Sequence, residues 1–323
     1  AINLTNSGVP SPVSIVVTGH NVTATGGAAG LVTQAATTTS GPVSYSFTAS
    51  QPGTYIYHSL DGSNPGLHVE MGLLGVLIVR PADGSRTAYG VDTGTDYEQE
   101  FLSLLTEVDP EIHLQMERGH VQHFTNSDRF AKVWFVNGRV FPDLFQGDYN
   151  PLFPHQPYES LAQAHPGEKV LVRQVNAGQD SHPFHFHGEN LRFIGRDGRA
   201  LSSGATTVDG RPVADLGRSD NTINSAPKQA IDAIWEWSGK QLGWDIYGHV
   251  AHTCEDTDGD GFGDGLNTTF EGEWCADHGK AFPVTLPGAG ELSLGGWWSG
   301  SPFLGDVGDL PPGEGGLNPF GGY

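Results

Sequence analysis

The sequence contains little positive charge. Only 16 Lys and Arg residues accompany 37 Asp and Glu residues, so the 323-residue chain has a formal net charge of −21 at pH 7. A protein with this excess of negative charge repels phosphate backbones and anionic lipid headgroups. We therefore expect no nucleic-acid partner.

Long hydrophobic runs and cysteine are also scarce. No apolar run approaches the roughly 18 residues that a membrane-spanning helix needs, so we expect no membrane insertion. The two cysteines, Cys254 and Cys275, flank an acidic stretch. In an oxidising compartment such a pair usually forms a disulfide. This prediction, together with the low charge density, indicates a protein that is extracellular, on the cell surface or periplasmic.

Glycine and proline are abundant, and they interrupt any long helical period. The sequence has 46 Gly and 21 Pro residues, close to twice the average share. Between them lie apolar or alternating runs of strand length, bounded by turn residues, as in β-sandwiches. The main runs are 12–17, 43–47, 55–57 and 75–79, followed by 100–105, 132–136 and 169–175. The sequence therefore predicts an all-β fold with few helices, the one short helical stretch being 114–121.

The two sets of runs predict two domains. A turn-rich stretch at 81–99 separates them, which places the boundary near residue 95. We predict a first domain at 1–95 and a second at 96–323. The second domain contains an insertion at about 245–280 and ends in a segment rich in Pro and Gly.

Three histidines lie within six residues at His182, His185 and His187. Side chains alternate along a β-strand, so His185 and His187 point to one face and both can reach one metal ion. His182, turned away by Pro183, can serve a second centre. Imidazole binds Cu, Zn, Fe and Ni, so the cluster alone does not choose the metal. Hydrogen-bonded loop histidines without a metal are the alternative.

Two segments of the sequence resemble the multicopper oxidase family. His-Pro-Phe-His-Phe-His-Gly at 182–188 is similar to the family's His-Pro-x-His-x-His-Gly box. Pro-Gly-Thr-Tyr-Ile-Tyr-His at 52–58, continued by Gly-Leu-Leu-Gly-Val-Leu-Ile-Val at 72–79, resembles a segment that the family shares with copper nitrite reductases and laccases. The resemblance implies two cupredoxin-like Greek-key β-sandwich domains and copper as cofactor.

The ligand set that the resemblance implies is incomplete. Val16 and Thr18 stand where the first His-x-His box is expected, and Leu60 replaces the partner of His58. Ser59 stands where nitrite reductases have their copper-binding cysteine. Leu73 stands in place of their methionine. The predicted copper ligands are therefore His182, His185, His187 and His58.

The resemblance also concerns the two ends of the sequence. Residues 1–6 are similar to the family's third strand, and the last copper-binding box is expected beyond Tyr323. The termini therefore look truncated relative to the family. A sandwich without those strands exposes an edge that another segment or a second copy can pair with.

A second metal-binding pattern, Asp-x-Asp-x-Asp-Gly-x-x-Asp, lies at 256–264. Alternate carboxylates converge on a hard cation, and the glycine permits a sharp turn. The predicted calcium ligands are Asp256, Asp258, Asp260, the Phe262 carbonyl and Asp264. The flanking cysteines indicate that the loop stabilises the fold. We prefer a disulfide between them to a copper thiolate formed by Cys254 with His252.

These observations leave two functions open. The first is a multicopper-oxidase-like, copper-binding protein outside the cytoplasm. Its copper site has fewer ligands than the family's, and if that site is active the protein takes electrons from a small molecule. The second is a non-catalytic filament, sheath or surface layer, a homo-oligomer or polymer built by strand donation and stabilised by calcium. Copper storage is disfavoured because Met71 and Met116 are the only thioethers, and thioethers are typical ligands of Cu(I).

Overall fold

The computed structural model describes residues 1–60, 65–120, 129–164, 167–236, 255–257 and 259. The chain divides into two compact units, of which the first comprises Ala1–Gln163 and Lys169–Glu236 and the second Ala164–Glu168 and Trp237–Tyr323. The fold described below is that of the first unit. The predicted domain boundary near residue 95 lies inside this unit and stays a prediction.

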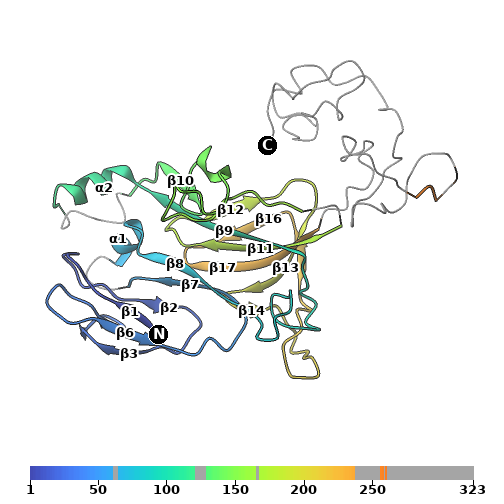
Figure 1. Cartoon of the computed structure of the whole chain (residues 1–323), viewed down its shortest axis with the longest axis horizontal. Helices are drawn as coiled ribbons and strands as arrows, with labels where there is room; N and C mark the ends of the chain where they lie inside the picture. The colour runs from blue at the N-terminus through green and yellow to red at the C-terminus, as the bar shows by residue number, and fades with distance from the viewer. Residues whose placement is uncertain (61–64, 121–128, 165–166, 237–254, 258, 260–323) are drawn as a thin grey trace, which may run out of the picture. The chain divides into compact units, whose positions relative to one another are not determined.

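Two three-stranded antiparallel sheets make up the first part of the chain (Figure 1). One has the strand order β1-β6-β3, the other the order β2-β7-β8, and β4 pairs with β5. Val43 and Tyr45 of the central strand β6 are fully buried and pack with Ala36. The strands are β1 (Ile2–Leu4), β2 (Val16–Val17), β3 (Thr23–Gly26), β4 (Ala28–Ala29), β5 (Gln34–Ala35), β6 (Val43–Ser46), β7 (Gly53–His58) and β8 (Leu74–Val79).

A seven-stranded sheet follows, in the order β10-β9-β11-β17-β13-β14, with β15 paired to β13. The central strand β11 is parallel to β9 and antiparallel to β17. Strands β12 and β16 form a separate antiparallel pair. The bounds are β9 (Gln99–Val108), β10 (Val133–Val136), β11 (Lys169–Asn176), β12 (His182–His185), β13 (Leu191–Arg196), β14 (Arg199–Ala200), β15 (Arg218–Asp220), β16 (Thr222–Ser225) and β17 (Gln229–Glu236).

Helices are few in the described part of the chain, which confirms the all-β prediction. They are α1 (Pro65–Glu70), α2 (Pro110–Glu117) and the 3-10 turn η3 (Asp143–Phe145). Helix α2 begins at Pro110, four residues before the predicted start at Leu114. The side chain of Asp109 caps it by accepting a hydrogen bond from the Glu111 amide at 3.0 Å, and proline is favoured in the first turn.

Strand β9 shows how alternation in the sequence orders the two faces of the sheet. Phe101, Ser103, Leu105 and Glu107 are buried, whereas the residues between them are half-buried on the opposite face. This is the period of two that a strand imposes. One acidic residue, Glu107, therefore shares the buried face with apolar neighbours.

A cluster of charged and polar side chains lies where β7, β11 and β17 meet, and all of its members except Glu100 are buried. Arg173 of β11 stands opposite Asp232 of β17 in the register, with 3.5 Å between Arg173 Nη1 and Asp232 Oδ1. Arg173 Nε donates to Glu100 Oε1 at 2.6 Å. Asp232 accepts hydrogen bonds from Thr54 at 2.5 Å and from Tyr89 at 2.6 Å. We call these five residues the Arg173 cluster.

Gly195 makes room for the tyrosine of this cluster. A Cβ atom at Gly195 would lie 1.7 Å from the hydroxyl oxygen of Tyr89. No side chain fits at that distance, so glycine at this position allows the Tyr89 hydroxyl to reach Asp232.

Candidate functional site

The histidine-rich segment forms strand β12 and the residues that follow it. His182, Phe184 and Phe186 are half-buried, whereas His185 and His187 are exposed on the other face. The rings of Phe184 and Phe186 pack edge to face with their centroids 5.1 Å apart. The phenylalanines therefore anchor the segment, and the alternation presents His185 and His187 together.

The two exposed imidazoles lie close to each other. The ring centroids of His185 and His187 are 5.1 Å apart. His185 Nδ1 lies 3.0 Å from Thr222 Oγ1, and that hydroxyl donates its own proton to Asn221 Oδ1 at 2.9 Å. Thr222 Oγ1 therefore accepts a hydrogen bond from His185 Nδ1–H, which leaves the lone pair of the neutral His185 ring on Nε2. Such a hydrogen bond fixes the tautomer and ring orientation of a metal-binding histidine.

His182 lies in a different environment. Its Nε2 atom is 2.7 Å from Glu107 Oε2. Glu107 also accepts hydrogen bonds from the backbone amides of Gln179 and Asp180, at 2.6 and 2.9 Å. Burial acts to raise the pKa of Glu107, but the hydrogen bonds from His182 and the two amides outweigh it and hold this pKa below its ordinary value. His182 is thus bound to a carboxylate.

A buried guanidinium completes this second environment. Arg129 forms ion pairs with Glu70 at 2.7 Å, Glu107 at 2.9 Å and Asp180 at 3.1 Å. The side chains of Glu70 and Glu107 are fully buried, and that of Arg129 is 4% exposed. We call these residues, with His182, the Arg129 cluster.

His58 ends strand β7 on the other sheet. Its Nδ1 donates to the Ser59 carbonyl at 3.0 Å, so the lone pair of the neutral ring is on Nε2. Burial lowers the pKa of His58, which favours the neutral form. The geometry of this single imidazole suits a ligand, but no structural contact groups it with the β12 histidines.

The residues that replace the family's ligands have structural roles. The Thr18 hydroxyl donates to the Ile56 carbonyl at 3.0 Å and accepts from the Ile56 amide at 3.1 Å. His68 is buried between two serines, with Nε2 at 2.6 Å from Ser11 Oγ and Nδ1 at 2.8 Å from Ser59 Oγ. Thr18, Ser59 and His68 therefore hold neighbouring backbone and side chains together.

Within the part of the chain that the structure describes, no three His, Cys, Asp or Glu side chains are grouped so as to hold a metal ion. Of the four predicted copper ligands, the structure brings together His185 and His187. It places His182 in the Arg129 cluster and His58 on strand β7. The His185–His187 pair fits part of a copper site, and the prediction of copper at all four histidines stays untested.

The predicted calcium loop lies largely outside the described residues. Asp256 is described, and its Oδ1 accepts a hydrogen bond from the Gly259 amide at 2.7 Å. The other predicted ligands and both cysteines are outside the described residues: Asp258, Asp260, Phe262, Asp264, Cys254 and Cys275. Calcium binding and the disulfide stay predictions.

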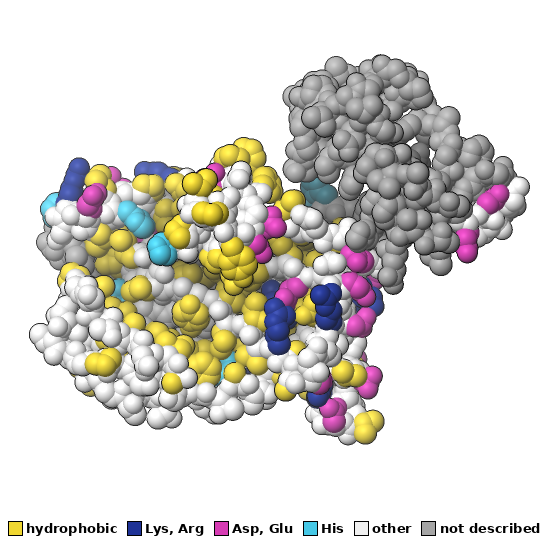
Figure 2. Space-filling view, in the orientation of Figure 1, with side chains coloured by type: hydrophobic (Ala, Val, Ile, Leu, Met, Phe, Trp, Pro, Cys, Tyr) yellow, Lys and Arg dark blue, Asp and Glu magenta, His cyan; other side chains and the backbone are white. Residues whose placement is uncertain are grey.

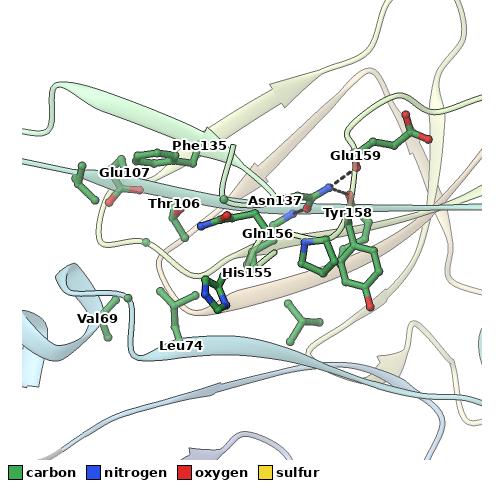
Figure 3. A pocket seen from close by; sticks show the side chains of 18 of the residues that line it. Val69, Leu74, Thr106, Glu107, Phe135, Asn137, His155, Gln156, Tyr158 and Glu159 are labelled. Atoms are coloured by element: carbon green, nitrogen blue, oxygen red, sulfur yellow. Dashed lines mark hydrogen bonds between the residues drawn. The ribbon is translucent and has the colours of Figure 1, made fainter. Parts of the chain in front are cut away.

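A cavity of about 1090 Å³ lies beside the Arg129 cluster. Its walls come from β8 on one side and from β9, β10 and the segment 148–161 on the other. In Figure 3, His155 extends from that segment towards Leu74, Thr106 and Phe135 lie across the space, and Tyr158 lines it farther from Leu74. The space-filling view shows hydrophobic side chains along the band between these layers (Figure 2).

Sequence reasoning missed Glu107, Arg129 and Thr222. A signal for Glu107 was present, since it continues the buried alternation of Phe101 and Leu105 on strand β9. A charged residue at an apolar position implies a buried partner. No comparable pattern marks Arg129 or Thr222, because their partners are distant in sequence.

The fold and site define the class as an all-β protein of paired sandwiches with a histidine-bearing strand. Family models described as "Multicopper oxidase" match residues 1–84 and 108–231, which together are more than half of the chain. The chain belongs to the multicopper oxidase family, as the resemblance implied, and its fold is cupredoxin-like.

Similar solved structures have low sequence identity. A structure titled as a multicopper oxidase is 17% identical with a TM-score of 0.44, over 73% of this chain and 64% of that chain. Blue copper oxidase from Nitrosomonas europaea is 18% identical with a TM-score of 0.47, over 72% of this chain and 61% of its own. Copper nitrite reductase from Nitrosomonas europaea is 17% identical with a TM-score of 0.45, over 73% of this chain and 69% of its own.

The chain thus spans less than two thirds of the length of the first two of these structures. No curated protein matches the sequence. Among the described residues, no helix combines the length and apolar character needed to cross a membrane.

Proposed function

We propose that this chain is a copper-binding protein that acts in electron transfer, with His185 and His187 as the central ligands. The supporting observation is the pair of exposed imidazoles whose ring centroids lie 5.1 Å apart on one strand face. Thr222 holds the His185 ring so that Nε2 carries the lone pair. Copper, when bound, supplies one-electron redox chemistry, and the chain's part is to position the imidazoles that bind it.

The wider proposal keeps four features that the sequence predicts. The first is a copper site with fewer ligands than the family's that includes His58 and His182, and the second is a small-molecule electron donor. The third is an extracytoplasmic location, and the fourth is bound calcium with a disulfide at 254–275. Strand donation between copies is a fifth. The edge position of strand β10 (Val133–Val136) supports it: among the described strands β10 pairs with β9 alone, and of its residues Val136 also bridges to Arg139.

Copper retention tests the central ligands. We expect the dialysed chain to retain Cu²⁺, and we expect His185→Gln and His187→Gln each to lower the affinity at least about tenfold. Thr222→Val is expected to lower it about tenfold as well, because loss of such a supporting hydrogen bond typically costs 10 to 100-fold. Equilibrium dialysis with metal analysis measures each affinity.

The matched control is His155→Gln, an exposed imidazole on the segment 148–161. This variant is expected to bind copper as the unchanged chain does. Equal affinity of the unchanged chain, His185→Gln and His187→Gln would refute the proposed site.

A further inference from the structure

The cavity beside the Arg129 cluster is not lined by any of the four predicted copper ligands. Its volume of about 1090 Å³ is slightly above the usual range for small-molecule sites, about 300 to 1,000 Å³. All of its lining residues belong to the first compact unit. A cavity of this size in one unit can hold an organic molecule.

The walls of the cavity are mixed, and their apolar part comes mainly from two strands. Leu74 and Val76 of β8 face Leu102 and Leu104 of β9, and all four are only partly buried by the protein. A ligand that covers them removes apolar surface from water, which contributes about 25 cal/mol per Å². The walls therefore favour a ligand with a hydrocarbon body.

Aromatic rings line the same space. Tyr57 stands opposite Gly75 in the register, where a Cβ atom would meet the tyrosine ring at 2.2 Å, so glycine leaves room for the ring over β8. Phe135 and Tyr158 contribute further rings from the opposite side. Faces of aromatic rings attract organic cations.

The Arg129 cluster gives one end of the cavity a negative charge. Glu70 and Glu107 line it, and both share the single guanidinium of Arg129 with Asp180. Lys228 interacts electrostatically with Glu107 and adds one positive charge. Two imidazoles also contact these carboxylates, with His113 Nε2 3.7 Å from Glu70 Oε1 and His182 Nε2 2.7 Å from Glu107 Oε2. Counted with both imidazoles neutral, three carboxylates meet two positive charges, and one negative charge is left over at this end.

The other charges of the lining do not cancel this excess. Arg80 is paired with Glu100, with 2.5 Å between Nη2 and Oε2. Glu100 in turn accepts from Arg173. An organic anion would thus meet no unpaired guanidinium among the described lining residues, whereas a cation gains from the excess charge. A bare metal ion is disfavoured because no three ligating side chains of the described chain are grouped.

We propose that this cavity binds a hydrophobic organic cation, an amine or ammonium group on an aryl or alkyl body. The ammonium group lies at the Glu70–Glu107 end, and the body lies along β8 and β9 among the aromatic rings. This inference does not depend on copper binding, so either proposal can fail without the other.

Calorimetric titration with three matched probes tests the charge preference. The probes are 4-phenylbutylammonium, the uncharged 4-phenylbutanol and the anionic 4-phenylbutyrate. We expect the ammonium to bind about tenfold more tightly than the alcohol, to weaken as salt is added, and the anion to bind most weakly. Equal affinities for ammonium and alcohol would overturn the proposal.

Two variants locate the site. Thr106 lines the cavity on β9, so Thr106→Trp is expected to fill the space and abolish binding of the ammonium probe. Thr25→Trp is the control, because Thr25 is an exposed strand residue outside the lining. Binding that survives Thr106→Trp, in protein whose thermal unfolding shows it to be folded, places the probe elsewhere and refutes the proposal.

The second variant, at Lys228, is expected to bind the ammonium probe more tightly. Lys228 donates to the carbonyl of Ala177 at 2.6 Å and also to the carbonyl of Gly178, which lines the cavity. Lys228→Gln removes a positive charge and is expected to tighten ammonium binding about threefold or more, with the alcohol unchanged. A misfolded variant cannot produce this gain, and an ammonium affinity that does not rise would contradict the proposed charge balance.

Discussion

Arg173→Met is expected to destabilise the protein by about 3 to 5 kcal/mol, the usual cost of removing one partner from a buried ion pair. The Arg173 side chain is fully buried, and that of Asp232 is 1% exposed. Without the guanidinium, Asp232 keeps hydrogen bonds from Thr54 and Tyr89 but has no positive charge beside it. Chemical denaturation of both proteins measures the difference in the free energy of unfolding.

The control is Arg196→Met, at an exposed position of strand β13. A surface change of this kind usually alters stability by less than about 0.5 kcal/mol. The double variant Arg173→Met with Asp232→Leu is expected to lose less than the sum of the two single changes, because the two residues are in contact. An Arg173→Met loss below about 1 kcal/mol would show that the cluster does not hold the sheets together.

The loss of unfolding free energy caused by Arg173→Met also depends on pH. Burial acts to raise the pKa of Glu100, but its hydrogen bonds and ion pairs with Arg80 and Arg173 hold this pKa below its ordinary value. A carboxyl group with a lowered pKa contributes stability above its unfolded pKa and loses it as the pH falls through the folded one. We therefore expect the stability difference between the unchanged chain and Arg173→Met to become smaller as the pH falls from about 5 to about 3.

Arg129→Met is expected to cost a similar amount, about 3 to 5 kcal/mol. The change leaves Glu70 and Glu107 buried without the guanidinium that pairs with both. Arg129→Lys keeps the positive charge but loses the planar fork, so an intermediate loss is expected. The loss is measured by the midpoint and slope of denaturant unfolding.

Arg118→Met is the control for this second prediction. Arg118 follows helix α2 and is exposed, so its loss is expected to change stability by less than about 0.5 kcal/mol. If Arg129→Met and Arg118→Met unfold at the same denaturant concentration, the Arg129 cluster has no net stabilising effect.

The strands of the two halves could be predicted because each has a local pattern. Strand β8 is a run of apolar residues, expected at 75–79 and observed at Leu74–Val79. Strand β9 alternates and was expected at 100–105, but it extends over Gln99–Val108. Strand β17 was missed because Asp232 interrupts its apolar residues. That aspartate is tolerated inside the sheet because Arg173 stands opposite it on β11, a pairing between segments 59 residues apart that no local pattern reveals.

The candidate site could be predicted only in part for the same reason. Alternation along β12 is a local property, and it correctly places His185 and His187 on one exposed face. The environment of His182 depends on Glu107, 75 residues earlier. The spacing of the histidines therefore predicted which of them share a strand face. It could not predict the carboxylate that binds His182.

Pulsed electron paramagnetic resonance of the Cu²⁺-loaded chain tests most directly whether His185 and His187 bind copper, because the remote nitrogen of a coordinated imidazole modulates the signal of the copper ion. For the unchanged chain, we expect modulation from at least two imidazoles, and one imidazole fewer in each of His185→Gln and His187→Gln. Spectra that are identical in the chain and in both variants would contradict copper binding at this strand.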